Sequence, residues 1–289
     1  MIPIVLLHHN DYDFLYRTIN SIKLNTIAPY KLIVVDNCST KNDSFWLKIK
    51  QNYPGIHIIF NKKNNWVYGF NLAKPFLEDH KYFVLSDADI EFPYPKNKVC
   101  WLTYLIKQLE TYAPIGKAGL PLDLDTIKED KNLSNLYNRE LSFKSGKMIG
   151  SNIIAPVDTT VAIYRSDIFM ENFYMRVGHF TNIKPKYYCV RVSEEFKCKH
   201  IGWEKYQSGK IKNKKNDNAI ILKAKFFGRY AIMMERDLLK QLSFYYKTKY
   251  FITFYFFRTF FSLRILINIV IYILSLKFLT DNANKYDNS

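Results

Sequence analysis

Two aspartates separated by one alanine, Asp87-Ala88-Asp89, are the residues whose type and spacing most clearly indicate chemistry. They come directly after the apolar run Tyr82–Leu85, which is typical of a buried strand. Two carboxylates at a strand end can share a hard divalent cation, because Mg²⁺ and Mn²⁺ prefer oxygen ligands and commonly join carboxylates to phosphates. The pattern therefore predicts a Mn²⁺ or Mg²⁺ site acting as a Lewis acid on substrate phosphates. The alternative is a solvated acidic turn, which surface loops often contain.

The chain before this pair alternates between strand-like and helix-like stretches, judged by apolar runs and by apolar residues at helical spacing. The predicted strands are Ile2–Leu7, Lys31–Val35, Ile56–Phe60 and Tyr82–Leu85, and the predicted helices are Asp13–Leu24, Ser44–Gln51 and Gly69–Glu78. This order predicts an α/β fold with a doubly wound sheet. Ligands of such sheets bind beyond the carboxyl ends of the strands, so Asp36 should lie at the same edge as the aspartate pair.

The middle of the chain has weaker patterns. Pro156–Tyr164 is strand-like, whereas the polar segment Asp123–Lys147 is expected to be a loop. Tyr187–Val192 and Phe196–Ile201 are expected to be two strands, with Ser193-Glu194-Glu195 turning between them as in a hairpin.

The C-terminal part of the chain is basic and rich in aromatic residues. Of the formal net charge of +16, residues 204–289 contribute +10, since they hold 16 Lys and Arg against 6 Asp and Glu. Such an excess suits anionic lipid, nucleic acid or phosphorylated substrates. We expect a catalytic domain at 1–209, a basic linker at 210–218 and a helical tail at 219–289.

The tail is expected to associate with a membrane surface. Its final apolar stretch, Ile265–Leu276, is shorter than the about 20 residues that span a bilayer, and a longer window includes Arg258 and Arg264. An interfacial helix or a helical hairpin on anionic lipid is therefore predicted. Interleaved aromatic and basic residues could also stack nucleobases, but the tail is more apolar than a nucleic-acid groove requires. A protein–protein helix pair is the second alternative, and no nucleic-acid partner is expected.

The cysteines and the N-terminus favour a cytoplasmic protein. The four cysteines form no CxxC pair, so they predict reduced thiols rather than zinc ligands. The first residues, Met1–His9, lack the basic leader and long apolar core of a signal peptide and are expected to begin the fold.

Several motifs, in order along about residues 1–205, resemble those of family-two glycosyltransferases of GT-A fold. Val34–Thr40 resembles the family's VVDNxST segment, and Asp87-Ala88-Asp89 resembles its DxD motif. The other matching positions are His9, Asn10, Leu15, Ser21, Ile22, Asn64, Gly69, Asn71 and Ala73. The resemblance implies a doubly wound mixed sheet of GT-A type, and a bacterial, membrane-associated enzyme of cell-surface polysaccharide or lipopolysaccharide synthesis.

The resemblance also implies which residues contact a nucleotide-sugar donor. Asp36 would accept hydrogen bonds from the base or ribose, although it could instead cap the following turn. Asp87 would face the ribose or the metal, and Asp89 would be a metal ligand. The other residues expected to line the donor site are His9, Asn10, Asn37, Asn64, Gly69, Asn71 and Ala88.

A histidine and a tryptophan near the end of the catalytic domain complete the implied site. His200 lies where relatives often carry a histidine that ligates the metal or contacts the diphosphate, although a lone histidine is often structural. Trp203 would form a wall of the sugar or acceptor pocket, or else belong to the core.

The catalytic base is expected among three carboxylates. Asp158 lies where family members receive the acceptor and could remove the proton of its hydroxyl. The chain lacks the Glu-Asp pair that many relatives carry, and Glu194 and Glu195 are the alternative bases, although that pair is also typical of an exposed turn.

The expected function is a glycosyltransferase of hexosyltransferase type, which transfers a sugar from a nucleotide diphosphate sugar to a saccharide or glycolipid acceptor with inversion. The expected location is the cytoplasmic face of the bacterial inner membrane, peripheral or monotopic. One alternative is a sugar nucleotidyltransferase, but His8-His9-Asn10-Asp11 stands where its glycine-rich, lysine-bearing loop would be. The other alternative is a non-catalytic, membrane-bound protein that binds a saccharide or nucleotide.

Overall fold

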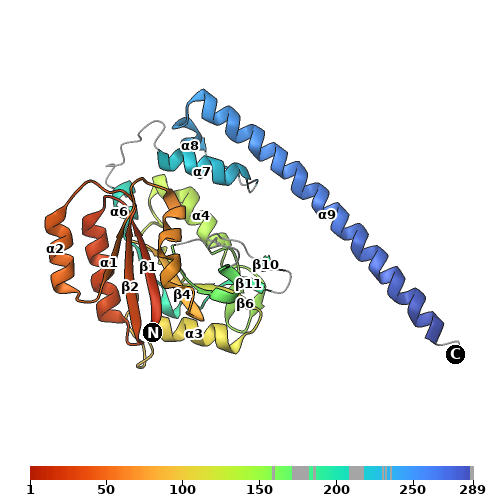
Figure 1. The fold of residues 1–289 in the computed structure, drawn as a ribbon, viewed down its shortest axis with the longest axis horizontal. Helices are drawn as coiled ribbons and strands as arrows, with labels where there is room; N and C mark the ends of the chain where they lie inside the picture. The colour runs from red at the N-terminus through yellow and green to blue at the C-terminus, as the bar shows by residue number, and fades with distance from the viewer. Residues whose placement is uncertain are drawn as a thin grey trace. The chain divides into compact units, whose positions relative to one another are not determined.

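A mixed β-sheet forms the centre of the N-terminal part of the chain in the computed structural model (Figure 1). The structure describes residues 1–157, 160–170, 182–184, 187–207, 218–229, 231, 233–234 and 236–286. The strands of this sheet are β1 (Ile2–His8), β2 (Tyr30–Asp36), β3 (His57–Phe60), β4 (Tyr82–Asp87), β6 (Ile115–Gly119), β7 (Met148–Ile149), β8 (Asn152–Ile154), β9 (Val161–Arg165), β10 (Asn182–Lys184) and β11 (Tyr187–Arg191). Their order is β3-β2-β1-β4-β9-β6-β11-β8-β7, and β10 pairs with β11.

The direction of the strands confirms the predicted doubly wound α/β architecture with a mixed sheet. β3, β2, β1 and β4 are parallel neighbours, and β6 is parallel to β11. β9 runs antiparallel between β4 and β6. The carboxyl ends of β1, β2 and β4 therefore meet at one edge, where His8 is in register with Asp36 and Leu7 with Asp87.

Both faces of the sheet are buried, which explains why its central strands are continuous apolar runs. In β1, Ile4 and Leu6 face one core, whereas Val5 faces the other. The first core is covered by α1 and α3, and the second by η1, a 3₁₀ helix, and α5. The helical elements of this part are α1 (Tyr12–Asn25), α2 (Asp43–Asn52), η1 (Trp66–Phe76), α3 (Trp101–Thr111), η2 (Lys131–Leu133), α4 (Ser134–Ser142), α5 (Ser166–Phe169), η4 (Glu194–Phe196) and α6 (Trp203–Gln207).

The predicted hairpin of Tyr187–Val192 with Phe196–Ile201 is wrong. The first segment is β11 and belongs to the main sheet, whereas the second contains β12 (Lys199–His200), which pairs with β5 (Ile90–Glu91) in a separate two-stranded sheet. The apolar pattern identifies both extended segments, but it carries no information about which backbone each one pairs with.

Two smaller expectations also need correction. The predicted loop Asp123–Lys147 contains a short helix, α4. The buried Glu140 of this helix forms an ion pair with Arg191. The helix predicted at Gly69–Glu78 is the 3₁₀ helix η1, which begins at Trp66 and contains Pro75. Proline has no amide hydrogen to donate, which disfavours a regular α-helix there.

The C-terminal unit, Lys212–Ser289, is a separate compact part of the chain. Its helices are α7 (Asn218–Arg229), α8 (Arg236–Lys240) and α9 (Phe244–Tyr286). α7 packs on the first turns of α9 around Ala224, Tyr250 and Phe254. The predicted linker lies outside the described residues except for Asn218, which begins α7.

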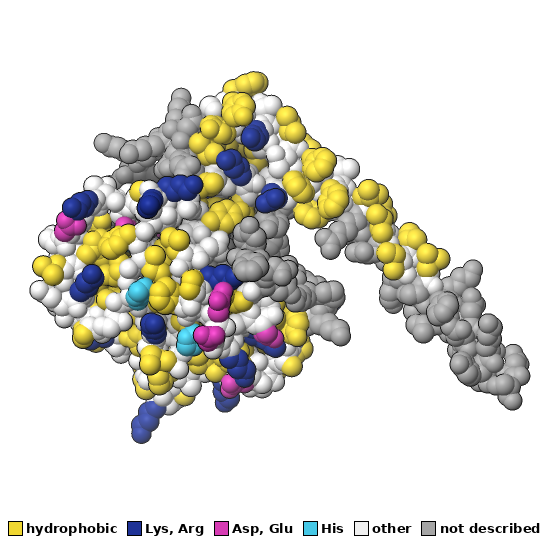
Figure 2. Space-filling model, in the orientation of Figure 1, with side chains coloured by type: hydrophobic (Ala, Val, Ile, Leu, Met, Phe, Trp, Pro, Cys, Tyr) yellow, Lys and Arg dark blue, Asp and Glu magenta, His cyan; other side chains and the backbone are white. Residues whose placement is uncertain are grey.

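Many apolar side chains of α9 beyond this contact are exposed, and Figure 2 shows them along one face of the helix. Ile252 is 66% exposed, Phe256 is 65% exposed and Leu274 is 60% exposed. Within the part of the chain that the structure describes, no helix is both long enough and apolar enough to cross a membrane.

Candidate active site

The aspartate pair lies at the edge of the sheet where the parallel strands end. Asp87 is the last residue of β4, and Asp89 follows it immediately before β5. Ala88, between them, is 7% exposed and packs into the core, so the chain turns around a buried residue and leaves the two aspartates partly exposed at the edge.

The two-stranded sheet β5–β12 brings His200 to this edge. His200 is in register with Ile90, and the amide of Ile201 donates to the carbonyl oxygen of Asp89 at 2.8 Å. Backbone pairing therefore places a histidine from the end of the catalytic unit beside an aspartate from its first half.

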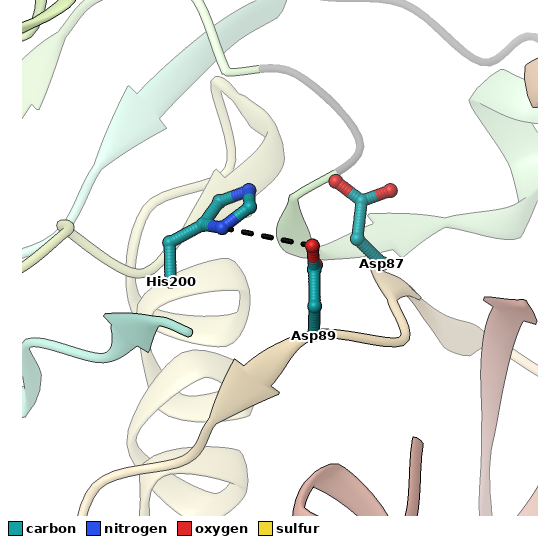
Figure 3. Close-up of side chains that lie close together, drawn as sticks. All are labelled: Asp87, Asp89 and His200. Carbon is teal, nitrogen blue, oxygen red and sulfur yellow. Dashed lines mark ion pairs between the residues drawn. The ribbon is translucent and has the colours of Figure 1, made fainter. Parts of the chain in front are cut away.

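Asp87, Asp89 and His200 converge on one point (Figure 3). One potential ligand atom from each residue lies within 4.8 Å of the other two. Nδ1 of His200 is 3.7 Å from Oδ2 of Asp89, which is longer than a hydrogen bond. Ligand atoms about 2.1 Å from one ion lie roughly 3.0–4.2 Å apart in octahedral geometry. The spacing of these three side chains therefore fits a shared divalent cation after small adjustments.

The polar atoms of this cluster support the same interpretation. Oδ1 of Asp89 and Nδ1 of His200 are buried and have no hydrogen-bond partner among the described residues. Burial raises the pKa of the Asp89 carboxyl above its usual value, and the neighbouring His200 opposes that rise. A buried carboxylate oxygen without a hydrogen bond is costly, and a bound cation would compensate the cost.

Gly202 is a residue of this site that the sequence interpretation missed. A Cβ atom at Gly202 would overlap Oδ2 of Asp89 and would lie 3.0 Å from Cε1 of His200. The carboxylate can therefore occupy its position only because residue 202 has no side chain. The sequence signal was a glycine two residues after a candidate ligand, in His200-Ile-Gly-Trp203.

Trp203 packs against the ring of His200. The two rings are stacked, with centroids 4.9 Å apart and an interplanar angle of 3°. Trp203 is only 5% exposed and packs with Leu124, Ile127 and Leu133. Trp203 therefore belongs to the core, as one of its two expected roles requires, and the stacking fixes the plane of the imidazole.

Asp36 lies at the same edge and is engaged by its own loop. Its carboxylate accepts hydrogen bonds from the hydroxyl and from the amide of Ser39. Burial raises the pKa of Asp36, and the Ser39 hydrogen bonds oppose that effect. Asn10 holds this loop in place through two hydrogen bonds. Its side-chain oxygen accepts from the backbone amide of Thr40 at 2.7 Å, and its backbone amide donates to the hydroxyl of Ser39 at 2.8 Å. The turn-capping role foreseen for Asp36 is therefore present in the structure.

Asn37 connects this loop to the segment before η1. Its amide nitrogen donates to Oδ1 of Asn64 at 2.9 Å and to the carbonyl of Trp66 at 3.0 Å. Its amide oxygen accepts from the side chain of Asn61 and from the backbone amide of Asn65, both at 3.0 Å. All four hydrogen bonds of this buried side chain are made within the protein. Asn37 and Asn64 therefore hold together the segments next to the expected donor site.

The remaining predicted donor-site residues lie around the same loop. Gly69 is buried, and a Cβ atom there would be 2.7 Å from Leu7 and 3.0 Å from Oδ1 of Asn37. Asn71 lies in η1, and its buried Oδ1 has no hydrogen-bond partner among the described residues. Nδ1 of His9 lies 3.1 Å from the carbonyl oxygen of Asn37. Burial lowers the pKa of the neighbouring His8 to about 3, so that ring is neutral.

The three candidate bases lie in different settings. Asp158 is outside the described residues. The backbone just before it is held by two cationic side chains: the fully buried Lys117 donates to the carbonyl of Val157 at 2.5 Å, and Arg191 donates to the carbonyl of Pro156 at 2.9 Å. Both glutamates are exposed in η4, where Glu194 is paired with Lys144.

Residues 4–173 match the family model described as glycosyl transferase family 2. This range includes both aspartates of the pair and ends before His200. No curated protein sequence matches the chain significantly.

Two solved structures share the fold. PcManGT, a mannosyltransferase from Pyrobaculum calidifontis in complex with GDP-Man and Mn²⁺, superposes with a TM-score of 0.54 at 13% identity, over 78% of this chain and 61% of that one. GalNAc-T7, solved with UDP, GalNAc and Mn²⁺, has a TM-score of 0.50 at 12% identity, over 69% of this chain and 43% of that one. The chain thus spans less than two thirds of either protein, and at these identities the similarity concerns the fold, which is that expected of a GT-A enzyme.

Proposed function

The chain belongs to glycosyl transferase family 2, and we propose that it transfers a sugar from a nucleoside diphosphate sugar to an acceptor hydroxyl in a metal-dependent reaction. The observation that carries this proposal is the convergence of Asp87, Asp89 and His200 within 4.8 Å at the carboxyl edge of the sheet. In doubly wound sheets this edge is where nucleotides bind. The donor class is that of PcManGT, whose structure contains GDP-Man and Mn²⁺.

The chain's own residues would divide the work as follows. Asp87, Asp89 and His200 would hold the cation, with Gly202 leaving room for the Asp89 carboxylate and Trp203 fixing the His200 ring. When bound, Mn²⁺ or Mg²⁺ supplies positive charge that stabilises the departing diphosphate. The acceptor oxygen bonds to the anomeric carbon as the bond to the diphosphate breaks, which inverts that carbon, and the hydroxyl proton passes to a carboxylate base.

Purified protein with Mn²⁺ and a panel of nucleotide sugars tests this function. Release of free nucleoside diphosphate that stops when EDTA is added is the expected result. Release of pyrophosphate would instead identify a nucleotidyltransferase. Binding of a donor without any turnover, across donors and saccharide acceptors, would identify a non-catalytic binding protein.

Asp158 is the base that we propose, because it matches the position at which family members receive the acceptor; Lys117 and Arg191 donate to the backbone carbonyls of the two residues before it. Asp158→Asn should lower turnover by about 10²-fold or more, since general-base catalysis contributes 10²–10⁴-fold. The measurement is the initial rate of transfer with donor and acceptor saturating. A loss below about threefold would assign the role to Glu194 or Glu195, which the matching Glu→Gln variants would separate.

The proposed acceptor is a saccharide or glycolipid at the cytoplasmic face of a membrane. The net charge of +10 in residues 204–289 and the exposed apolar surface of α9 support this proposal. Full-length protein should sediment with vesicles that contain phosphatidylserine, and a chain ending at Asn218 should stay in the supernatant. Vesicles of phosphatidylcholine alone are the control for charge, because basic residues contribute about 1 kcal/mol each near an anionic surface. Sedimentation of the truncated chain would contradict the proposal.

A further inference from the structure

We propose that Arg17, on α1, is a positioning residue for the metal site, because it sets the spacing between the segment that carries Asp89 and the segment that carries His200. This inference rests on the proposed function, since it concerns the cation ligands of that site. Arg17 itself touches none of the three ligands.

The segment after Asp89 is attached to α1 by hydrogen bonds that its backbone amides donate to buried side chains. The hydroxyl of Thr18 accepts from the amide of Ile90 at 3.0 Å, and the hydroxyl of Ser21 accepts from the amide of Phe92 at 3.1 Å. Both acceptors are on the face of α1 that also carries the fully buried Leu15, Ile19 and Ile22. β5 is therefore fixed to a rigid element, and Asp89 enters it from the preceding residue.

The segment that carries His200 is joined to α1 through charged side chains of α6 instead of buried hydroxyls. β12 is only two residues long, and α6 begins three residues after His200. A ladder this short is weak by itself. What fixes α6 to α1 is a pair of ion pairs, in which Asp11 accepts from Lys205 and Arg17 donates to Glu204.

Arg17, unlike Lys205, also forms an ion pair with a residue of β5. Its Nη1 and Nη2 atoms donate to the two carboxylate oxygens of Glu204, both at 2.9 Å. Its Nε and Nη2 atoms donate to Oε1 of Glu91 at 3.2 and 3.0 Å. Glu91 follows Asp89 by two residues and Glu204 follows Gly202 by two. The planar guanidinium thus joins the two segments from which Asp89 and His200 project, with a fixed fork geometry.

Because these side chains are exposed, loss of Arg17 should change the spacing of the metal ligands more than the stability of the fold. The side chains of Arg17, Glu91 and Glu204 are 38%, 34% and 52% exposed. Ion pairs this open to water contribute little to the stability of a fold. Loss of Arg17 should therefore leave the fold intact, with α6 still attached through Lys205 and Asp11, while the ligand spacing relaxes.

Mn²⁺ binding without donor tests the inference, with free Mn²⁺ measured by electron paramagnetic resonance and the fold by thermal unfolding. Arg17→Met should weaken Mn²⁺ binding about 10-fold, the lower end of what loss of an outer partner of a metal site causes. Glu204→Gln leaves the ion pair between Arg17 and Glu91 in place, and it should weaken Mn²⁺ binding less than Arg17→Met does. The matched control is Arg165→Met, which removes an arginine that pairs with Asp167 at the opposite edge of the sheet.

The outcomes are distinct. Wild-type Mn²⁺ affinity in a folded Arg17→Met protein, or an equal loss in Arg165→Met, would overturn the positioning role. If Arg17→Met does not fold, Glu204→Gln decides by the same criteria. Failure of the wild-type protein to bind Mn²⁺ at all would instead refute the metal-dependent function on which the inference rests.

Discussion

Asp89→Asn should abolish metal-dependent turnover, with kcat reduced at least about 10³-fold. The substitution keeps the shape of the side chain but removes the charge from the ligand that lies next to His200 and has a buried oxygen without a partner among the described residues. A catalytic metal contributes several kcal/mol of charge stabilisation, and each 1.36 kcal/mol is a factor of ten in rate. The measurement is nucleoside diphosphate release over a range of Mn²⁺ concentrations.

Thermal unfolding distinguishes this effect from misfolding. A ligand at 100 times its Kd stabilises a protein by about 2.7 kcal/mol, so Mn²⁺ should raise the melting temperature of the wild type and leave that of Asp89→Asn unchanged. Without metal the variant should be at least as stable as the wild type, because the carboxylate it replaces is partly desolvated. Asp125→Asn, at a carboxylate whose side chain is 81% exposed, is the control. Normal Mn²⁺ dependence in Asp89→Asn would refute the metal site.

Gly202→Ala should have the second largest effect, a loss of about 10²-fold in turnover at limiting Mn²⁺. The new methyl group would occupy the position of Oδ2 of Asp89, so either the carboxylate or the turn after His200 must move. A shift of about 1 Å in a catalytic group can cost 10²-fold. Titration with Mn²⁺ should show the loss mainly as weaker metal affinity.

Gly119→Ala is a matched control for crowding. Its Cβ atom would overlap the side chain of Val157 instead of a metal ligand. Overpacking of this kind typically costs about 1–3 kcal/mol of stability. Both variants should therefore be destabilised, but only Gly202→Ala should lose Mn²⁺ affinity. If Gly202→Ala and Gly119→Ala bind Mn²⁺ equally well, the space at residue 202 serves packing alone.

The part of the site that follows the sheet could be predicted from local patterns. Apolar runs identify β1, β2 and β4, and the residues that follow such runs in a parallel sheet must share an edge. That argument places Asp36 beside the aspartate pair without any tertiary information. It does not show that Asp36 is engaged by Ser39, because that contact depends on the path of the loop.

The part that depends on long-range pairing could not be predicted in this way. His200 follows only from the resemblance, and the local pattern predicts the wrong partner for the strand that contains it. Two-residue strands such as β5 and β12 carry too little periodicity to reveal their pairing. The role proposed for Arg17 depends on this pairing, so no local pattern indicates it, and the local signal for Gly202 is only its place two residues after His200.

The two-residue ladder between β5 and β12 has a consequence for synthesis of the chain. Both aspartates leave the ribosome early, but the histidine that faces them belongs to the last described strand of the catalytic unit. A nascent chain stalled before residue 199 would carry an open, two-ligand site. If these three residues hold a divalent cation as proposed, tight capture of the cation should therefore begin only when translation has passed this strand, which would make acquisition of the ion a marker of a finished catalytic unit.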